Sequence, residues 1–312
     1  MIDIIKYEKG LQNEWNEFVD RSKNETFLFN RNYMDYHSDR FIDHSLMIYY
    51  KNKLTALFPA NIKGRYLYSH GGLTYGGFII TDKINTTLML KIFEEMKNYC
   101  TGEGIQKIIY KSIPHIYHKK PAEEDLYALY VNKASLVRRD VSSTVCLSNF
   151  KINNNKKNGV RKAEKSGLVV EQCDEVKAFW GLVNSRLYEK YRVNSVHTAD
   201  EMKILMDKFQ NNIKLFCAKL NNDILGGALI YETDTVAHAQ YLTTNEEGRE
   251  KRALDLVISF LLNDYYKNKL WFDFGISTEQ QGYYLNESLI KQKEEYGASA
   301  VNYDTYELSC MV

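Results

Sequence analysis

A carboxylate stands inside an aromatic run near the end of the sequence, where Asp273 lies between Trp271-Phe272 and Phe274. An ionised carboxylate is costly to bury without a partner. Asp273 is therefore a candidate for proton chemistry. The alternative is a structural carboxylate that helix-end amides or a lysine satisfy.

Two side chains of a neighbouring apolar run could also move protons. His238, like Asp273, could act as the general base that deprotonates a nucleophile. Tyr241 could then protonate the leaving group. A structural histidine on a strand is the alternative reading of His238.

Two further stretches could meet phosphate groups. Ser69–Gly77 is a glycine-dense loop, which permits close backbone approach to a ligand, but no helix follows it at once, so it is not a P-loop. A packed loop is the alternative. A basic helix could meet a sugar-nucleotide diphosphate or tRNA phosphates, or could simply face solvent. Its cations are Lys156, Lys157, Arg161, Lys162 and Lys165.

Composition narrows the class of protein. A length of 312 residues favours two domains, and a net charge of +1 gives no broad basic footprint for nucleic acid. The five cysteines are scattered and never in CxxC spacing, which predicts reduced thiols and no metal site. No signal peptide or membrane-spanning run is evident, so we expect a cytoplasmic protein that binds no DNA.

The elements that must position these residues are clearest in the second half. We predict helices over Asn154–Ser166, Asp174–Tyr191, Thr198 onward, Arg249–Lys267 and Tyr284–Tyr296. The predicted strands are Leu168–Cys173, Ile213–Leu220, Ile224–Glu232, Val236–Thr243, Leu270–Ile276 and Ser299–Leu308. Alternation along the fourth of these strands places His238, Gln240 and Leu242 on one face, and Tyr241 and Thr243 on the other.

The first half repeats this order of elements more faintly, from the strand Ile2–Tyr7 to the strand Ser135–Leu147. Agreement between the halves predicts a tandem duplication of one α/β unit, with mixed sheets flanked by helices. We expect domains at residues 1–147 and 148–312. The first would shape the acceptor side, and the second would serve the donor and the chemistry.

The element order is that of the GNAT N-acyltransferase fold, and three short motifs in the second half strengthen the likeness. Lys157–Gly167 resembles the basic helix that opens the second FemAB domain. Trp271–Gly275 resembles the family's aromatic-Asp-Phe-Gly strand, and Lys293–Gly297 its terminal F-K-x-x-F-G motif. The chain thus resembles the FemAB-like and BioF2-like tandem GNAT acyltransferases.

The resemblance implies a donor site where the fourth and fifth strands of the second half splay apart. The implied donor-binding residues are Gln240, Thr243, Asn245, Gly248, Arg249, Arg252 and Gly275. The turn after the fourth strand would normally hold a pyrophosphate at a helix N-terminus. Here it has one glycine, and Glu246, Glu247 and Glu250 would repel that group, although Arg249, Lys251 and Arg252 could offset the repulsion.

The resemblance also places Lys293 at the reaction centre, where a cation could stabilise an oxyanion. A solvated helix lysine is the alternative. We expect the acceptor to enter between the domains. The implied acceptor-binding residues are His70, Gly71, Gly72, Tyr75, Tyr188, Tyr191, Arg192, His197, Ser277 and Gln281.

The resulting hypothesis is an enzyme that moves an acyl, acetyl-like group from a CoA thioester to an amine of a cell-envelope or sugar-nucleotide precursor. One alternative is an aminoacyl-tRNA-dependent aminoacyltransferase of FemAB type. The other is a binding module that kept the GNAT fold without catalysis.

Overall fold

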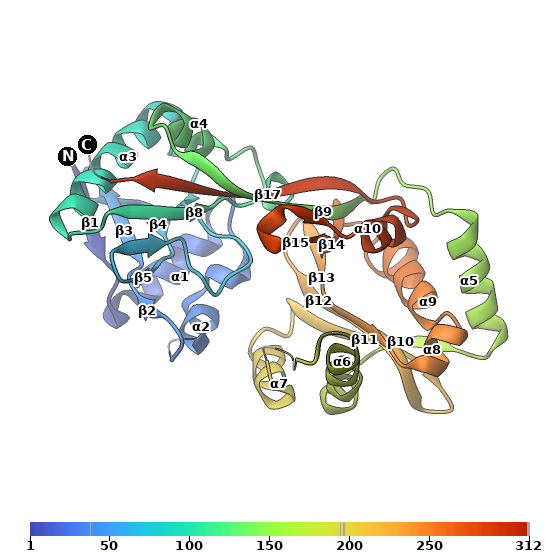
Figure 1. The fold of residues 1–312 in the computed structure, drawn as a ribbon. Helices are drawn as coiled ribbons and strands as arrows, with labels where there is room; N and C mark the ends of the chain where they lie inside the picture. The colour runs from blue at the N-terminus through green and yellow to red at the C-terminus, as the bar shows by residue number, and fades with distance from the viewer. Residues whose placement is uncertain (38, 194, 196, 311–312) are drawn as a thin grey trace. The chain divides into compact units, whose positions relative to one another are not determined.

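A computed structural model describes residues 1–37, 39–193, 195 and 197–310 (Figure 1). The chain divides into two compact units. Unit 1 holds Met1–Asp140, Gln280–Tyr284 and Asn302–Val312, and unit 2 holds Val141–Glu279 and Leu285–Val301. Both units mix strands and helices, which is the predicted fold class.

Unit 1 contains two groups of strands. The first is a sheet of order β1-β3-β4-β7, and the second follows the order β17-β8-β6-β5-β2, in which β17 spans Ser299–Ser309. The strands are β1 Ile2–Lys6, β2 Ile42–Asp43, β3 Leu46–Tyr50, β4 Lys53–Phe58, β5 Asn61–Lys63, β6 Tyr66–Tyr68, β7 Ile79–Ile80 and β8 Lys107–Lys111. The helices are α1 Gln12–Asp20, α2 Arg31–Met34, α3 Thr86–Gly102 and α4 Glu124–Val131.

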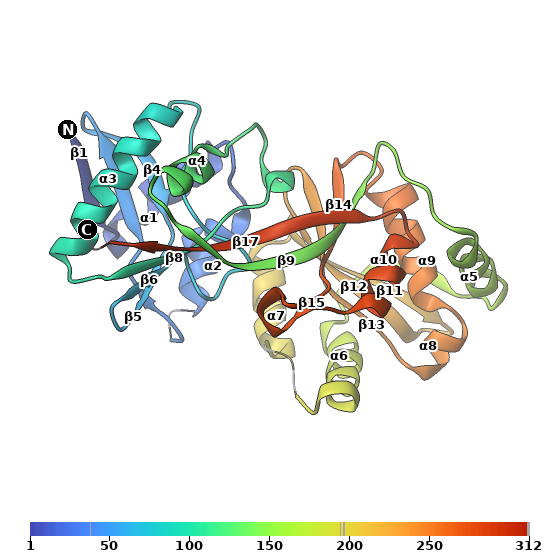
Figure 2. The same ribbon diagram turned by 45° about the horizontal axis from the view of Figure 1, so that its top comes forward.

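The core of unit 1 lies between its sheets and two helices. Leu88, Met89 and Ile92 recur at helical spacing on α3, and they pack with Ile48 of β3 and Ala128 of α4 in one buried cluster. Figure 2 shows α3 and α4 in unit 1 from above.

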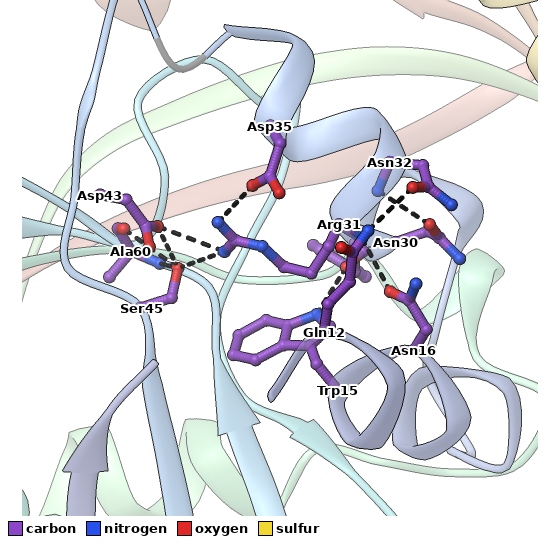
Figure 3. A network of polar contacts seen from close by, with 11 residues as sticks. Gln12, Trp15, Asn16, Asn30, Arg31, Asn32, Asp35, Asp43, Ser45 and Ala60 are labelled. Atoms are coloured by element: carbon purple, nitrogen blue, oxygen red, sulfur yellow. Dashed lines mark hydrogen bonds and ion pairs between the residues drawn. The ribbon is translucent and has the colours of Figure 1, made fainter. Parts of the chain in front are cut away.

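A buried cation ties α2 to the strands of unit 1 (Figure 3). The Arg31 guanidinium is 4% exposed, donates to the Ser45 hydroxyl at 3.1 Å and pairs with Asp35 and Asp43. Its Cζ atom lies 3.9 Å from the centre of the Tyr7 ring. A buried charge needs such pairing, so we interpret this network as structural.

Unit 2 contains the strand order β10-β11-β12-β13-β14-β9. The strands are β9 Ser135–Cys146, β10 Val169–Cys173, β11 Ile213–Leu220, β12 Asp223–Glu232, β13 Val236–Thr244, β14 Trp271–Ile276, β15 Thr278–Glu279, β16 Tyr284–Leu285 and β17 Ser299–Ser309. The helices are α5 Asn154–Lys165, α6 Val176–Tyr191, α7 Ala199–Lys208, α8 Glu246–Glu250, α9 Ala253–Phe260 and α10 Glu287–Glu294. In Figure 1, α9 lies on one face of this sheet, and α6 and α7 lie on the other.

Two predicted helices of unit 2 are shorter than expected. The helix predicted over Arg249–Lys267 breaks at Arg252, whose φ of 64° is left-handed, and turns into a π-helix at Leu261. The helix predicted over Tyr284–Tyr296 begins only at Glu287, because Asn286 caps it by accepting from the Leu289 amide. Apolar periodicity marks a helical face, but it does not reveal these breaks.

Two strands pass from one unit to the other. β9 starts in unit 1, and its residues Ser142–Cys146 pair with β14 in unit 2. β17 starts in unit 2, and its residues Thr305–Ser309 pair with β8 in unit 1. Each unit is therefore completed by a strand that reaches it from the other.

In both units the fourth and fifth strands of the repeat pair in parallel over three residues. β6 and β8 pair in unit 1, and β13 and β14 pair in unit 2. The repeated parallel pair supports the tandem arrangement. Among the described residues, no helix is both long and apolar enough to cross a membrane.

Candidate active site

The candidate site begins where β13 and β14 part. Their parallel register runs from Val236–Trp271 to His238–Asp273 and stops there, although β13 continues to Thr244 and β14 to Ile276. The register of β14 with β9 is also interrupted after Asp273. Phe274 and Gly275 are therefore left out of the regular register, which resumes with Ile276 opposite Ser142.

Asp273 lies at the point of divergence and is fully buried. Its Oδ1 atom accepts from the Ser142 hydroxyl at 2.5 Å and the Thr144 hydroxyl at 2.8 Å. Burial alone would raise the pKa of Asp273, but these hydroxyls and His238 outweigh burial and lower the pKa to about 2. The carboxylate is therefore ionised at neutral pH.

His238 completes a dyad with Asp273. Its Nδ1 atom lies 2.8 Å from Asp273 Oδ2, and its side chain is 13% exposed. An ionised carboxylate at Nδ1 favours the tautomer in which Nδ1 carries the proton. In that tautomer Nε2 carries the lone pair, which is the nitrogen at which a general base oriented by a carboxylate accepts a proton.

Gly275 keeps space open beside the imidazole. Its φ of 77° is left-handed, and a Cβ atom built on it would lie 3.4 Å from His238 Cε1. Glycine adopts this conformation without the strain other residues incur. The sequence predicts Gly275 as a donor-binding residue, and the structure places it next to the dyad.

Lys293 reaches the same end of β14 from α10. Its ammonium donates to the Gly275 carbonyl at 2.8 Å, the Ile276 carbonyl at 2.9 Å and the Ser277 hydroxyl at 2.9 Å. Burial lowers its pKa to about 8, against the attraction of Asp273. Lys293 is thus not the solvated helix lysine considered above. Its three contacts hold the backbone that follows Asp273.

A β-bulge corrects the predicted faces of β13. The register with β12 slips between the pairs Leu229–Tyr241 and Ile230–Ala239, which leaves Gln240 without an opposite residue. Beyond the bulge, Leu242 packs with the α9-side core, while Tyr241 and Thr243 turn toward α6. The alternation expected along the strand therefore fails after Gln240.

Tyr241 consequently lies on the α6 side, which is also the side of His238. Its ring contacts Trp180 edge-on, with 4.9 Å between the ring centres. Burial raises the pKa of Tyr241, which keeps the phenol protonated at neutral pH. A protonated phenol suits the predicted role of acid to the leaving group.

The predicted pyrophosphate turn is occupied by protein groups. The Asn245 side chain accepts from the Gly248 amide at 2.7 Å, and a Cβ on Gly248 would lie 2.2 Å from the Leu225 carbonyl oxygen. Arg249 is exposed on α8. The Arg252 Nε atom pairs with buried Asp255 at 2.6 Å. Three exposed glutamates stand here as well: Glu246, Glu247 and Glu250.

Asp255, which the sequence did not single out, neutralises the cations near this turn. It accepts from the Tyr296 hydroxyl at 2.5 Å and lies 3.4 Å from the Lys156 ammonium. Lys156 is also paired with Glu295 at 3.5 Å. Because the Gly248 amide and Arg252 are already engaged, and the three exposed glutamates outnumber the exposed Arg249, the turn is a poor fit for the pyrophosphate of CoA.

The predicted acceptor residues of unit 2 have mixed environments. Tyr188 is 56% exposed, and the Arg192 guanidinium lies 5.1 Å from its ring centre. His197 is buried, and Ser277 is buried under Lys293. The side chain of Tyr191 lies outside the described residues.

The remaining acceptor candidates belong to unit 1. His70 is buried, the Gly71 amide donates to Asn61 Oδ1 at 2.6 Å, and a Cβ on Gly72 would lie 2.5 Å from the Phe41 ring. Tyr75 is buried, with its ring centre 4.4 Å from that of Tyr117. Close packing alone accounts for glycine at 72. Gln281 follows β15, with a left-handed φ of 58°.

The structure therefore brings His238, Asp273, Gly275 and Lys293 together around one strand end. Sequence reasoning missed Ser142 and Thr144, which hold Asp273. Both lie in a predicted strand at alternate positions, but only the register of β9 with β14 shows that they face Asp273. Among the described residues, no cluster of three or more His, Cys, Asp or Glu side chains could hold a metal ion.

A family model described as an acetyltransferase (GNAT) domain matches residues 151–284. No curated protein matches the sequence. Among solved structures, FemX gives a TM-score of 0.67 at 12% identity and covers 97% of this chain and 96% of its own. A tandem GNAT protein from the clavulanic acid biosynthesis pathway gives 0.51 at 6% identity and covers 100% and 99%.

A third structure is the C-terminal domain of a candidate lysylphosphatidylglycerol synthetase from Agrobacterium fabrum. It gives a TM-score of 0.63 at 11% identity and covers 96% of this chain and 92% of its own. The matched model identifies residues 151–284 as a GNAT-type acyltransferase domain, and the solved structures show that the whole chain shares a tandem GNAT fold. The likeness to FemX and to the synthetase domain extends over nearly the whole chain and shows a shared fold, which agrees with the tandem GNAT arrangement that the sequence predicts.

Proposed function

We propose that unit 2 catalyses the transfer of an acyl or aminoacyl group onto an amine, with His238 as general base. The observation that supports this proposal is the His238–Asp273 pair, 2.8 Å apart at the point where β13 and β14 diverge. An attacking amine must lose a proton, and Nε2 of a histidine oriented by a carboxylate can accept it.

The other residues have supporting roles in this proposal. Ser142 and Thr144 hold the carboxylate through Oδ1, which leaves Oδ2 for His238. Lys293 positions the carbonyls and hydroxyl that follow Asp273. To stabilise an oxyanion directly, Lys293 would have to exchange one of these three contacts. Tyr241 is available as a protonated acid.

The occupied turn at α8 favours an aminoacyl ester over a CoA thioester as the donor. GNAT domains use acyl-CoA, and the family match keeps that donor as the second candidate. Against it stand the three glutamates and the pairing of Arg252 and Lys156 with Asp255. The candidate lysylphosphatidylglycerol synthetase is named for an aminoacylated product, and the shared fold therefore supports an aminoacyl donor.

A donor panel tests this function. We expect charged tRNA to raise the melting temperature and to support transfer to an amine acceptor, whereas acetyl-CoA and free CoA do neither. A ligand at about 100 times its Kd adds about 2.7 kcal/mol of stability. Transfer from acetyl-CoA at a greater rate would reverse the donor assignment.

The Asp273→Asn variant tests the dyad separately. An Asn amide group facing Nδ1 would favour the opposite tautomer, so that Nε2 carries the proton and cannot act as a base. We expect transfer to fall by about a hundredfold or more. If transfer persists while only stability falls, Asp273 is a structural residue.

A further inference from the structure

Four lysines line a groove in unit 1 that the chemistry proposed above does not use. The groove has a volume of about 580 Å³ and lies between the β3–β4 hairpin and the start of α3. Its cations are Lys51, Lys53, Lys83 and Lys91. Thr55, Thr87, Asn85 and Tyr50 supply polar groups to the same walls.

The four ammonium groups are not neutralised by the protein. Among the residues that the structure describes, none of the four has a carboxylate within ion-pair distance. The nearby acid Asp82 is already paired with Lys120 at 2.6 Å. No acidic residue lines the groove. Such a concentration of positive charge attracts anions into a concave site.

The repeat allows an internal comparison, because both units have the same hairpin. In unit 1 the turn between β3 and β4 is Lys51-Asn52, with φ values of 51° and 59°. In unit 2 the turn between β11 and β12 is Asn221-Asn222, with φ values of 49° and 72°. The closing pairs are Tyr50–Lys53 and Leu220–Asp223. The hairpins therefore correspond residue by residue.

The charges at these corresponding places are opposite. The unit 2 hairpin carries Asp223 where unit 1 carries Lys53. The helix that follows the fourth strand begins with Glu246 and Glu247 in unit 2. In unit 1 the corresponding helix, α3, has no acid in its first turn. Lys83 precedes this helix and Lys91 lies within it.

We propose that the lysine groove of unit 1 binds the diphosphate group of a small molecule, such as a nucleoside diphosphate. Four cations can neutralise a diphosphate, and lysine binds phosphate as a compact point charge. A volume of about 580 Å³ is enough for such a ligand. Asn85 caps the Leu88 amide at the start of α3, and Thr87 of the same first turn lines the groove.

The probes are inorganic pyrophosphate, ADP and UDP, titrated into the full chain by calorimetry at low salt. We expect binding that weakens as salt rises. The double variant Lys83→Ser/Lys91→Ser should weaken it by about tenfold or more. Both lysines are exposed, so the fold should be unchanged, and the melting temperature checks this.

The matched control is Lys9→Ser/Lys63→Ser, which removes two exposed lysines of unit 1 that lie outside the groove. This control should leave the affinity for pyrophosphate within about twofold, because salt screens a bound ligand from charges that lie outside the groove. Equal losses in the two double variants would overturn the site. Tighter binding of a single-stranded oligonucleotide than of pyrophosphate would overturn the diphosphate assignment.

This site is independent of the donor assignment. A His238→Asn variant, which removes the proposed base of unit 2, should bind pyrophosphate with unchanged affinity. Loss of transfer with retained pyrophosphate binding separates the two proposals. If the unaltered chain catalyses transfer but does not bind pyrophosphate, the groove is not a diphosphate site, and the chemistry proposed for unit 2 still stands.

Discussion

At the scale of single residues, the candidate site depends on how one carboxylate is shared. Asp273 uses one oxygen for two hydroxyls and the other for His238. This division keeps the carboxylate ionised and directs the imidazole. A buried carboxylate with three such contacts is both stable and chemically useful.

Replacing His238 by Asn separates orientation from proton transfer. The Asn amide can still donate to Asp273 Oδ2, but it has no basic nitrogen. We expect kcat to fall by about a hundredfold to ten-thousandfold. Thermal unfolding should show a stability change within about 1 kcal/mol. Unchanged turnover in steady-state assays would exclude His238 as the base.

Lys293 predicts a specific dependence of stability on pH. Burial lowers its pKa from 10.5 to about 8. Between these values the unfolded chain binds more protons, so stability should rise as pH increases from 8 to 10.5. Below pH 8 the full cost of burying the charge is present. The Lys293→Met variant should lack this rise in denaturant titrations, whereas Lys291→Met, on exposed helix surface, should retain it.

At the scale of elements, the sequence predicts the sheet of unit 2 well. β11 matches its predicted bounds, and β12, β13, β14 and β17 differ by one residue at an end. Alternation and hairpin turns carry this information locally. Local sequence patterns do not reveal the Gln240 bulge or the break at Arg252, because both depend on packing against neighbouring elements. The contact of Ser142 and Thr144 with Asp273 likewise depends on long-range register.

The left-handed turn at Gly275 should be intolerant of substitution. Gly275→Ala forces an L side chain into a φ of 77° and places a methyl group 3.4 Å from His238 Cε1. We expect a loss of about 1–2 kcal/mol of stability and a larger loss of turnover. Gly181→Ala is the control, because nothing lies within 4 Å of its Cβ and it stands in α6. Equal effects of the two changes on turnover would contradict the role of Gly275.

At the scale of the whole chain, the order of elements predicts the repeat, but not the strands that cross between units. Sequence patterns indicate that Ser135–Leu147 and Ser299–Leu308 are strands, without showing which strand each one pairs with. In the structure β9 pairs with β14 and β17 pairs with β8. The domain boundary expected after residue 147 remains a prediction.

The pairing of β17 with β8 can be tested in the full chain. Glu307 lies opposite Ile109 and forms an ion pair with Lys107 at 2.7 Å. Glu307→Pro should disrupt the ladder, because proline lacks the amide hydrogen and clashes in a strand. We expect faster hydrogen exchange in Lys107–Lys111. Glu307→Thr, which removes only the ion pair, should leave exchange nearly unchanged, and equal protection in both variants would contradict the pairing.

The crossing strands also bear on how the protein is made. During synthesis, unit 1 emerges from the ribosome long before residues 302–309, which complete its β8 edge. Until then, the unpaired amides and carbonyls of β8 could pair with another nascent chain. The strand that closes the first unit is therefore made only after nearly all of unit 2, so a translation pause near residue 300 should yield aggregates instead of a folded half.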